Sequence, residues 1–208
     1  AVAIVRRMEV GNIVEYIDRQ KIVCAVVIAV KNQRLRLLSE TNREVNLPAN
    51  RLLHIESTRL DLSVGRDRLV VSLKEMARRR NEMVGRIDVQ ELWQVLKSER
   101  EWIDLETMAA FCFPDESGPD QQSAVIRAFF DDRLYFKFSP GRFFPNTEEQ
   151  VERLAAQREE EERRLRLVSR GRRWLSRLRN GDSPVSAADL SEDIVEVAGI
   201  LRSYFLFG

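Results

Sequence analysis

Basic side chains alternate with leucines along one short stretch of the chain, Arg34-Leu35-Arg36-Leu37. Successive side chains of a β-strand point to opposite faces, so this spacing puts both arginines on one face. Lys31 and Arg43 flank the stretch. A cationic, solvent-facing strip of this kind can neutralise phosphates along a nucleic-acid backbone without reading its sequence. An ordinary solvated sheet face, balanced by Glu40 and Glu44, is the simpler explanation of the same alternation, and both stay open.

A second group of cations is interleaved with aromatic residues in the β-hairpin that we predict for residues 135–144. Aromatic rings stack on nucleobases, while Arg and Lys hold phosphates. Phe136 and Phe138 are better explained as the core face of the hairpin. The remaining candidates for secondary contacts to nucleic acid are Tyr135, Lys137 and Arg142.

The sequence offers little for catalysis. It has one histidine, His54, and two cysteines, Cys24 and Cys112, with no phosphate-binding glycine loop, no HExxH and no CxxC. We interpret His54 as a packed or capping side chain at a strand end and both cysteines as core residues. We therefore predict no catalytic residue, no metal site and no cofactor in this chain, which favours a binding module over an enzyme.

Charge is distributed unevenly along the chain. The 208 residues have a formal net charge of +1, which excludes a polycation that coats nucleic acid indiscriminately. The net charge is +4 over residues 1–60, +3 over 61–86, −5 over 87–146 and −1 over 147–208. The N-terminal part is thus the basic one. Within it, Arg78-Arg79-Arg80 forms a basic helical turn that we interpret as a solvated helix face rather than a phosphate contact.

The hydrophobic pattern predicts an α+β fold in four consecutive parts. Short runs rich in Val, Ile and Leu predict four or five strands within residues 8–56, enough for a small, closed SH3-like β-barrel. In residues 61–86 the apolar spacing changes to three and four, which predicts a connecting helix. Residues 87–146 contain three helix-sized units and a β-hairpin, the layout of a winged helix-turn-helix. Residues 147–208 are predicted to form a charged helical arm, with a last helix after Ser186.

No stretch of the sequence predicts a membrane-spanning helix. The longest apolar run, Ile22 to Val30, covers about half of the roughly 20 residues that a span requires. Ala1 to Val5 is followed by two arginines, the reverse of the order in a secretion signal. Two cysteines far apart fit a reducing compartment. We therefore expect a cytoplasmic protein with no membrane partner.

Seven stretches carry a resemblance to a known family: Gly11–Tyr16, Cys24–Val27, Arg34–Leu38, Arg43–Leu47, Ala124–Phe130, Leu134–Lys137 and Phe144–Pro145. They resemble the N-terminal region of bacterial ribonuclease II-type exoribonucleases, the RNB family. The resemblance implies hydrolytic degradation of RNA from its 3′ end, with Mg²⁺ held by clustered aspartates in a large catalytic domain. It also implies small RNA-binding domains before that domain, which in one branch of the family are a helix-turn-helix module.

The aspartate cluster of that family has no counterpart here, so no catalytic residue carries over and the implied Mg²⁺ belongs to a domain outside this chain. The apolar end, Tyr204 to Gly208, suggests a piece of a longer protein, with Met8 as its natural start. We therefore predict the N-terminal, RNA-binding portion of a 3′→5′ exoribonuclease. It would guide single-stranded RNA to its own catalytic domain, without a small-molecule substrate. The predicted backbone contacts are Lys31, Arg34, Arg36 and Arg43.

Two alternatives come from other classes of protein. A winged-helix DNA-binding regulator would need a basic recognition helix, and the helix predicted from Gln121 to Asp132 offers only Arg127 to the groove. A protein-interaction scaffold would use the acidic segment, residues 87–146, to dock a partner or the catalytic domain.

Overall fold

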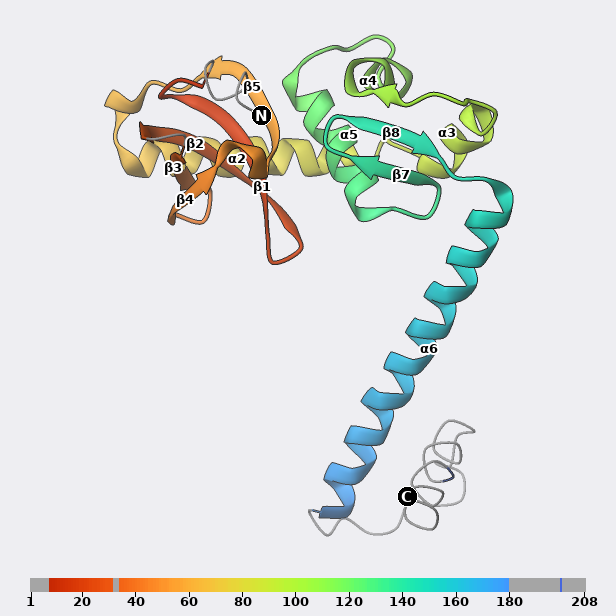
Figure 1. Ribbon diagram of the computed structural model, residues 1–208. Helices are drawn as coiled ribbons and strands as arrows, with labels where there is room; N and C mark the ends of the chain where they lie inside the picture. The colour runs from red at the N-terminus through yellow and green to blue at the C-terminus, as the bar shows by residue number, and fades with distance from the viewer. Residues whose placement is uncertain (1–7, 32–33, 180–198, 200–208) are drawn as a thin grey trace. The chain divides into compact units, whose positions relative to one another are not determined.

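The computed structural model describes residues 8–31, 34–179 and 199. The chain divides into two compact units, residues 1–147 and 148–208. The described part is α+β, with five α-helices and two antiparallel sheets (Figure 1). The α+β class predicted from the hydrophobic pattern is confirmed.

The first sheet has five antiparallel strands in the order β4-β3-β2-β1-β5. Their bounds are β1 Asn12–Asp18, β2 Lys21–Lys31, β3 Arg34–Ser39, β4 Glu44–Pro48 and β5 Leu52–Arg59. A single 3₁₀ turn, η1 (Ala49–Arg51), joins the last two strands. Each strand begins within two residues of the apolar run that predicts it.

The sheet is open, whereas the sequence led us to expect a closed barrel. In the described residues β4 and β5 form the two edges and do not pair with each other. Pro48 ends β4 and has no N–H to donate to a further strand, which is the usual place for proline in a sheet.

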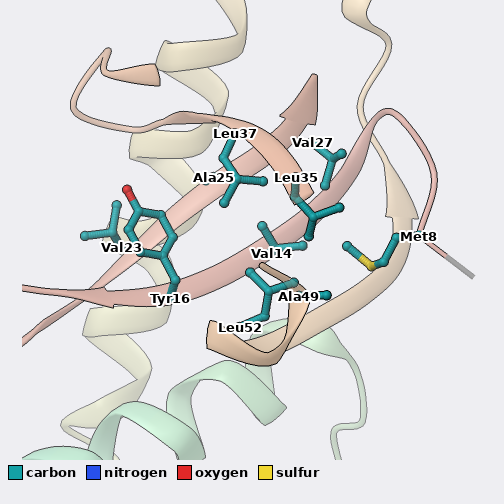
Figure 2. Close-up of a cluster of buried hydrophobic side chains, with 10 residues drawn as sticks. All are labelled: Met8, Val14, Tyr16, Val23, Ala25, Val27, Leu35, Leu37, Ala49 and Leu52. Atoms are coloured by element: carbon teal, nitrogen blue, oxygen red, sulfur yellow. The ribbon is translucent and has the colours of Figure 1, made fainter. Parts of the chain in front are cut away.

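Both faces of this sheet bury apolar side chains. One cluster lies within the curl of the sheet and includes Val14, Leu35, Leu37 and Leu52, whose side chains point toward one another in Figure 2. The register shifts between Val27 and Ala29, where β2 has one more residue than β3. Such a bulge increases the local bend and twist of a strand, which helps the sheet to curl around this cluster.

The opposite face of the sheet packs on α2 (Arg66–Val84) (Figure 1). Leu69, Val70, Leu73 and Ala77 of α2 are buried against the sheet. Their spacing of three and four residues gives the helix one apolar face. A 3₁₀ turn, η2 (Leu62–Val64), precedes this helix.

The remainder of the first unit contains three helices and a small sheet. Their bounds are α3 Val89–Leu96, β6 Ile103–Asp104, α4 Leu105–Cys112, α5 Pro119–Asp131, β7 Phe136–Ser139 and β8 Arg142–Pro145. The sheet order is β6-β8-β7. Asp88 and Asp104 cap α3 and α4, because each carboxylate accepts a hydrogen bond from the backbone N–H three residues later.

An aromatic cluster holds α5 against the small sheet. The ring of Phe129 lies 5.0 Å from that of Phe136 and 4.7 Å from that of Phe143. All three side chains are fully buried. Phe136 is therefore a core residue, as its alternation with polar neighbours predicts, and Phe138 packs partly buried beside Phe143.

The second unit is described as one long helix, α6 (Glu148–Arg179). Its charged surface carries ion pairs one turn apart, between Arg158 and Glu162 and between Arg163 and Glu160. The further helix predicted after Ser186 lies outside the described residues, as do the side chains of Trp174 and Leu178. None of the helices in the described ranges is long and apolar enough to cross a membrane.

Candidate nucleic-acid interface

Three of the predicted phosphate-binding cations line one hollow on the five-stranded sheet. The hollow has a volume of about 450 Å³, and its lining residues are Ala29, Lys31, Arg34, Arg36 and Asn46. We call it the basic hollow. Its three cations are exposed to solvent. The described residues that line it include no acidic side chain.

Strand pairing explains why these residues meet. Lys31 of β2 lies opposite Arg34 of β3, and Ala29 lies opposite Arg36. Paired residues of neighbouring strands share a face, and so do residues two apart along one strand. Arg36 is in turn opposite Asn46 of β4, which completes the hollow.

Glu44 borders the hollow and engages one of its cations. Its carboxylate accepts hydrogen bonds from Arg36 Nε at 2.8 Å and from Arg66 Nη1 of α2 at 2.5 Å. These hydrogen bonds hold the pKa of Glu44 below its ordinary value. Arg36 is therefore partly neutralised by Glu44, which agrees with the simpler explanation of an ordinary, charge-balanced sheet face. No ion pair of Lys31 or Arg34 is found among the described residues.

Arg43 and Glu40 do not belong to the basic hollow. Arg43 lies between β3 and β4, where its carbonyl accepts a hydrogen bond from the N–H of Ser39 at 2.9 Å. Glu40 is half-buried, and burial raises the pKa of its carboxyl group. The structure thus brings Lys31, Arg34 and Arg36 together and leaves Arg43 apart.

The outer face of the small sheet carries a second exposed feature, which we call the aromatic–cation patch. It consists of Trp102, Lys137, Arg142 and Phe144. The rings of Trp102 and Phe144 are 5.5 Å apart. Arg142 lies over the ring of Trp102 at 5.3 Å, and Lys137 lies over that of Phe144 at 5.5 Å. Trp102 is 45% exposed, the largest aromatic side chain left open to solvent in the described part.

Strand alternation separates this patch from the core. Lys137 pairs with Phe144 on one face of the sheet, whereas Phe138 pairs with Phe143 on the other. Trp102 directly precedes Ile103, which pairs with the buried Phe143. Trp102 therefore lies on the outer face with Phe144.

Sequence reasoning found only part of this patch. It proposed Lys137 and Arg142, which belong to it, and Tyr135, which packs its ring 5.5 Å from buried Trp93 instead. It missed Trp102 and Phe144. The signal for Trp102 was weak, because β6 is only two residues long and its sequence reads as a loop before a helix cap.

A buried cluster of charges joins the five-stranded sheet to α2 and α5. Its centre is Arg80 of α2, which is 1% exposed and forms ion pairs with Glu15 of β1, Glu56 of β5 and Asp120 of α5. Arg127 of α5 also binds Glu15, with Nη2 2.5 Å from Oε1. Two cations thus face three carboxylates inside the first unit. We call these five residues the buried charge cluster.

This cluster corrects two interpretations of the sequence. Arg80 does not lie on a solvated helix face, because its side chain is buried in ion pairs with Glu15 and Glu56. Its neighbour Arg79 lies on a different side of α2 and is half-exposed. Arg127 is 5% exposed and paired with Glu15, so it is not available to a DNA groove.

The pKa values of the cluster reflect burial set against ion pairing. Burial raises the pKa of Glu15, but Arg127, Arg80 and the Ser123 hydroxyl, which donates to Oε2 at 2.7 Å, outweigh burial and hold that pKa below its ordinary value. For Glu56, burial outweighs the contact with Arg80 and raises the pKa. The pKa of Arg80 is raised by Glu15 and its other neighbours despite burial, which keeps the guanidinium charged.

His54 and the two cysteines are packed groups rather than reactive ones. His54 Nε2 lies 3.3 Å from Gln122 Oε1, and burial lowers the pKa of the ring below its ordinary value. Burial raises the pKa of the Cys24 thiol and raises that of Cys112 to about 12. A thiol with a raised pKa is a poor nucleophile, because the thiolate is the reactive form.

Comparison with known proteins gives no relative for this chain: no family model, no curated protein and no solved structure matches it. The resemblance to RNB-family exoribonucleases therefore remains a prediction from the seven stretches that carry it.

Proposed function

We propose that this chain binds single-stranded RNA through the basic hollow, as the RNA-guiding portion of a 3′→5′ exoribonuclease. The observation that carries the proposal is the convergence of Lys31, Arg34 and Arg36 on one open surface. Cations grouped in this way attract the phosphate backbone whatever its sequence. Such binding suits a protein that passes a strand along rather than stopping at one site.

The proposal extends to the fold of each half of the first unit. We interpret the five-stranded sheet, with its curled core and the 3₁₀ turn between β4 and β5, as a partly open SH3-like barrel. We interpret residues 87–146 as a winged helix-turn-helix, because their order is helix, strand, helix, helix, strand and strand. Small barrels and winged helices both serve as nucleic-acid-binding modules.

Contacts of α5 favour RNA over the duplex-DNA alternative. A winged-helix regulator places side chains of its recognition helix in the major groove. In α5 the only cation is Arg127, and its guanidinium is held by Glu15 and by Asn81 Oδ1 at 2.9 Å. The helix therefore presents no cation to DNA.

In the proposed mechanism this chain supplies positioning and no bond cleavage. The basic hollow holds the phosphates of an unpaired strand, and the buried charge cluster fixes α2 and α5 against the sheet that carries the hollow. Hydrolysis would take place in an RNB-type catalytic domain outside this chain, with Mg²⁺ as its cofactor. We place the protein in the cytoplasm, where reduced thiols such as Cys24 and Cys112 persist.

Fluorescence anisotropy with a labelled single-stranded RNA tests the proposal. The triple variant Lys31→Ala/Arg34→Ala/Arg36→Ala should bind more weakly, and by a similar factor for oligonucleotides of different sequence. The matched control, Lys21→Ala/Arg51→Ala/Arg68→Ala, removes three exposed cations that lie outside the hollow and should bind as the wild type does.

Two results would contradict RNA binding through the basic hollow, and a third would contradict the division of labour. In one, the hollow variant and the control variant lose affinity for single-stranded RNA by the same factor, which would mean that binding depends on net charge and not on the hollow. In the other, duplex DNA of equal length binds as tightly as single-stranded RNA at physiological salt, which would favour the DNA-binding alternative. Degradation of RNA by the purified chain in the presence of Mg²⁺ would contradict the assignment of catalysis to another domain.

A further inference from the structure

We infer that the aromatic–cation patch is a second contact site for single-stranded RNA, at which unpaired nucleobases stack. This inference rests on the proposed function and adds to it a preference for unpaired bases. The ligand is a single-stranded segment of RNA, recognised through the flat faces of its bases.

The first step is that Trp102 is not needed by the core. It is 45% exposed, and the aromatic core of the small sheet is completed by Phe129, Phe136 and Phe143. Aromatic side chains are enriched at interaction surfaces relative to the rest of a protein surface. Trp102 and Phe144 form an aromatic pair on the outer face of β6 and β8.

The second step is the chemistry beside the rings. Arg142 and Lys137 lie at 5.3 and 5.5 Å from the centres of the Trp102 and Phe144 rings. Arg142 is paired in register with Asp104, but the carboxylate of Asp104 caps α4 by accepting the N–H of Thr107 at 2.8 Å. An aromatic pair bordered by two exposed cations matches a strand that presents bases and phosphates in alternation.

The third step is energetic. An exposed cation–π contact contributes less than the stack of a base on an aromatic ring. A base that displaces Arg142 or Lys137 from its ring therefore gains more than the contact it breaks. The released cation then reaches the phosphate next to that base.

The test separates bases from phosphates. Binding is measured for a twelve-nucleotide oligoadenylate and for an abasic ribose–phosphate strand of the same length, which has the same backbone charge and no bases. Trp102→Ala should weaken oligoadenylate binding about fivefold or more. The affinity of the Trp102→Ala variant for the abasic strand should equal that of the wild type.

Two further variants control for folding and for exposed aromatic area. Phe111→Ala removes an aromatic side chain of similar exposure, 49%, from α4 and should alter neither affinity. Trp102→Phe keeps a ring at the site, so it should retain most of the preference for the strand that has bases, even if Trp102→Ala is poorly folded.

The inference and the proposed function fail in different ways. Equal oligoadenylate binding by wild type and Trp102→Ala, or equal weakening for both strands, would overturn the inference while the basic hollow keeps its role. Loss of abasic-strand binding in the Lys31/Arg34/Arg36 variant would support the proposed function alone. If neither strand binds the wild-type chain, both ideas are wrong. If only a protein ligand occupies the patch and bases do not compete for it, the inference is overturned in favour of a protein interface.

Discussion

Substitution of Arg80 should lower the free energy of unfolding of the first unit far more than substitution of its neighbour Arg79. Arg80 is 1% exposed and has ion pairs with Glu15, Glu56 and Asp120. In Arg80→Met the side-chain volume is nearly kept, but two buried carboxylates lose a charged partner. Glu15 retains Arg127, whereas for Glu56 no other side-chain partner is found in the described residues.

The expected cost follows from that geometry. Breaking a buried ion pair by removing one partner costs about 3–5 kcal/mol, because the remaining carboxylate must either stay charged without compensation or take up a proton. Arg79→Met is the matched control: Arg79 shares Asp120 but is half-exposed, so its loss should cost about 0–1 kcal/mol. Urea unfolding followed by tryptophan fluorescence measures both, since Trp93 is buried in the same unit.

A double-mutant cycle checks the cause. Glu56→Gln should destabilise the wild type but recover stability in the Arg80→Met background, where it removes the unpaired carboxylate. A loss below about 1 kcal/mol for Arg80→Met, or no coupling with Glu56→Gln, would refute the assignment of a stabilising role to the buried charge cluster. If Arg80→Met does not fold, the rescue by Glu56→Gln remains measurable as recovered soluble, folded protein.

Two further predictions concern titration and reactivity. Burial lowers the pKa of His54 in the folded state. Below pH 6.5 the unfolded chain therefore binds more protons at this residue than the folded chain does. The free energy of unfolding should be highest above that pH and should fall by up to about 1.4 kcal/mol per pH unit below it. His54→Gln should flatten this part of a pH series of urea unfolding curves, and an unchanged slope would refute the role of His54. Glu15, whose folded pKa is lowered, should add a loss below pH 4.5. The raised pKa values of Cys24 and Cys112 predict slow reaction of both thiols with a disulfide reagent at pH 8 until urea unfolds the chain, and rapid labelling of the native protein would contradict this.

Local sequence signals predicted much of this fold. Short runs rich in Val, Ile and Leu predicted four or five strands, and a spacing of three and four located α2. The prediction of a closed barrel was wrong, since apolar runs report where strands lie and do not report which edge strands pair.

Long-range contacts explain what the sequence did not reveal. Arg78, Arg79 and Arg80 look alike in sequence, and only contacts with Glu15 and Glu56, 65 and 24 residues away, bury the third of them. Arg127 was expected to be exposed because its partner, Glu15, lies 112 residues earlier in another element. The hollow formed by Lys31, Arg34 and Arg36 was largely predictable, because those residues lie close together in sequence on two strands that pair with each other.

The most direct test of the central claim is the salt dependence of single-stranded RNA binding. If two to three phosphates are neutralised by Lys31, Arg34 and Arg36, these residues contribute about 1.4–2.1 to the slope of log affinity against log salt concentration. The Lys31→Ala/Arg34→Ala/Arg36→Ala variant should lose that part of the slope, while the Lys21→Ala/Arg51→Ala/Arg68→Ala control keeps it. Equal slopes for the wild type and the first variant would show that the RNA backbone is held elsewhere.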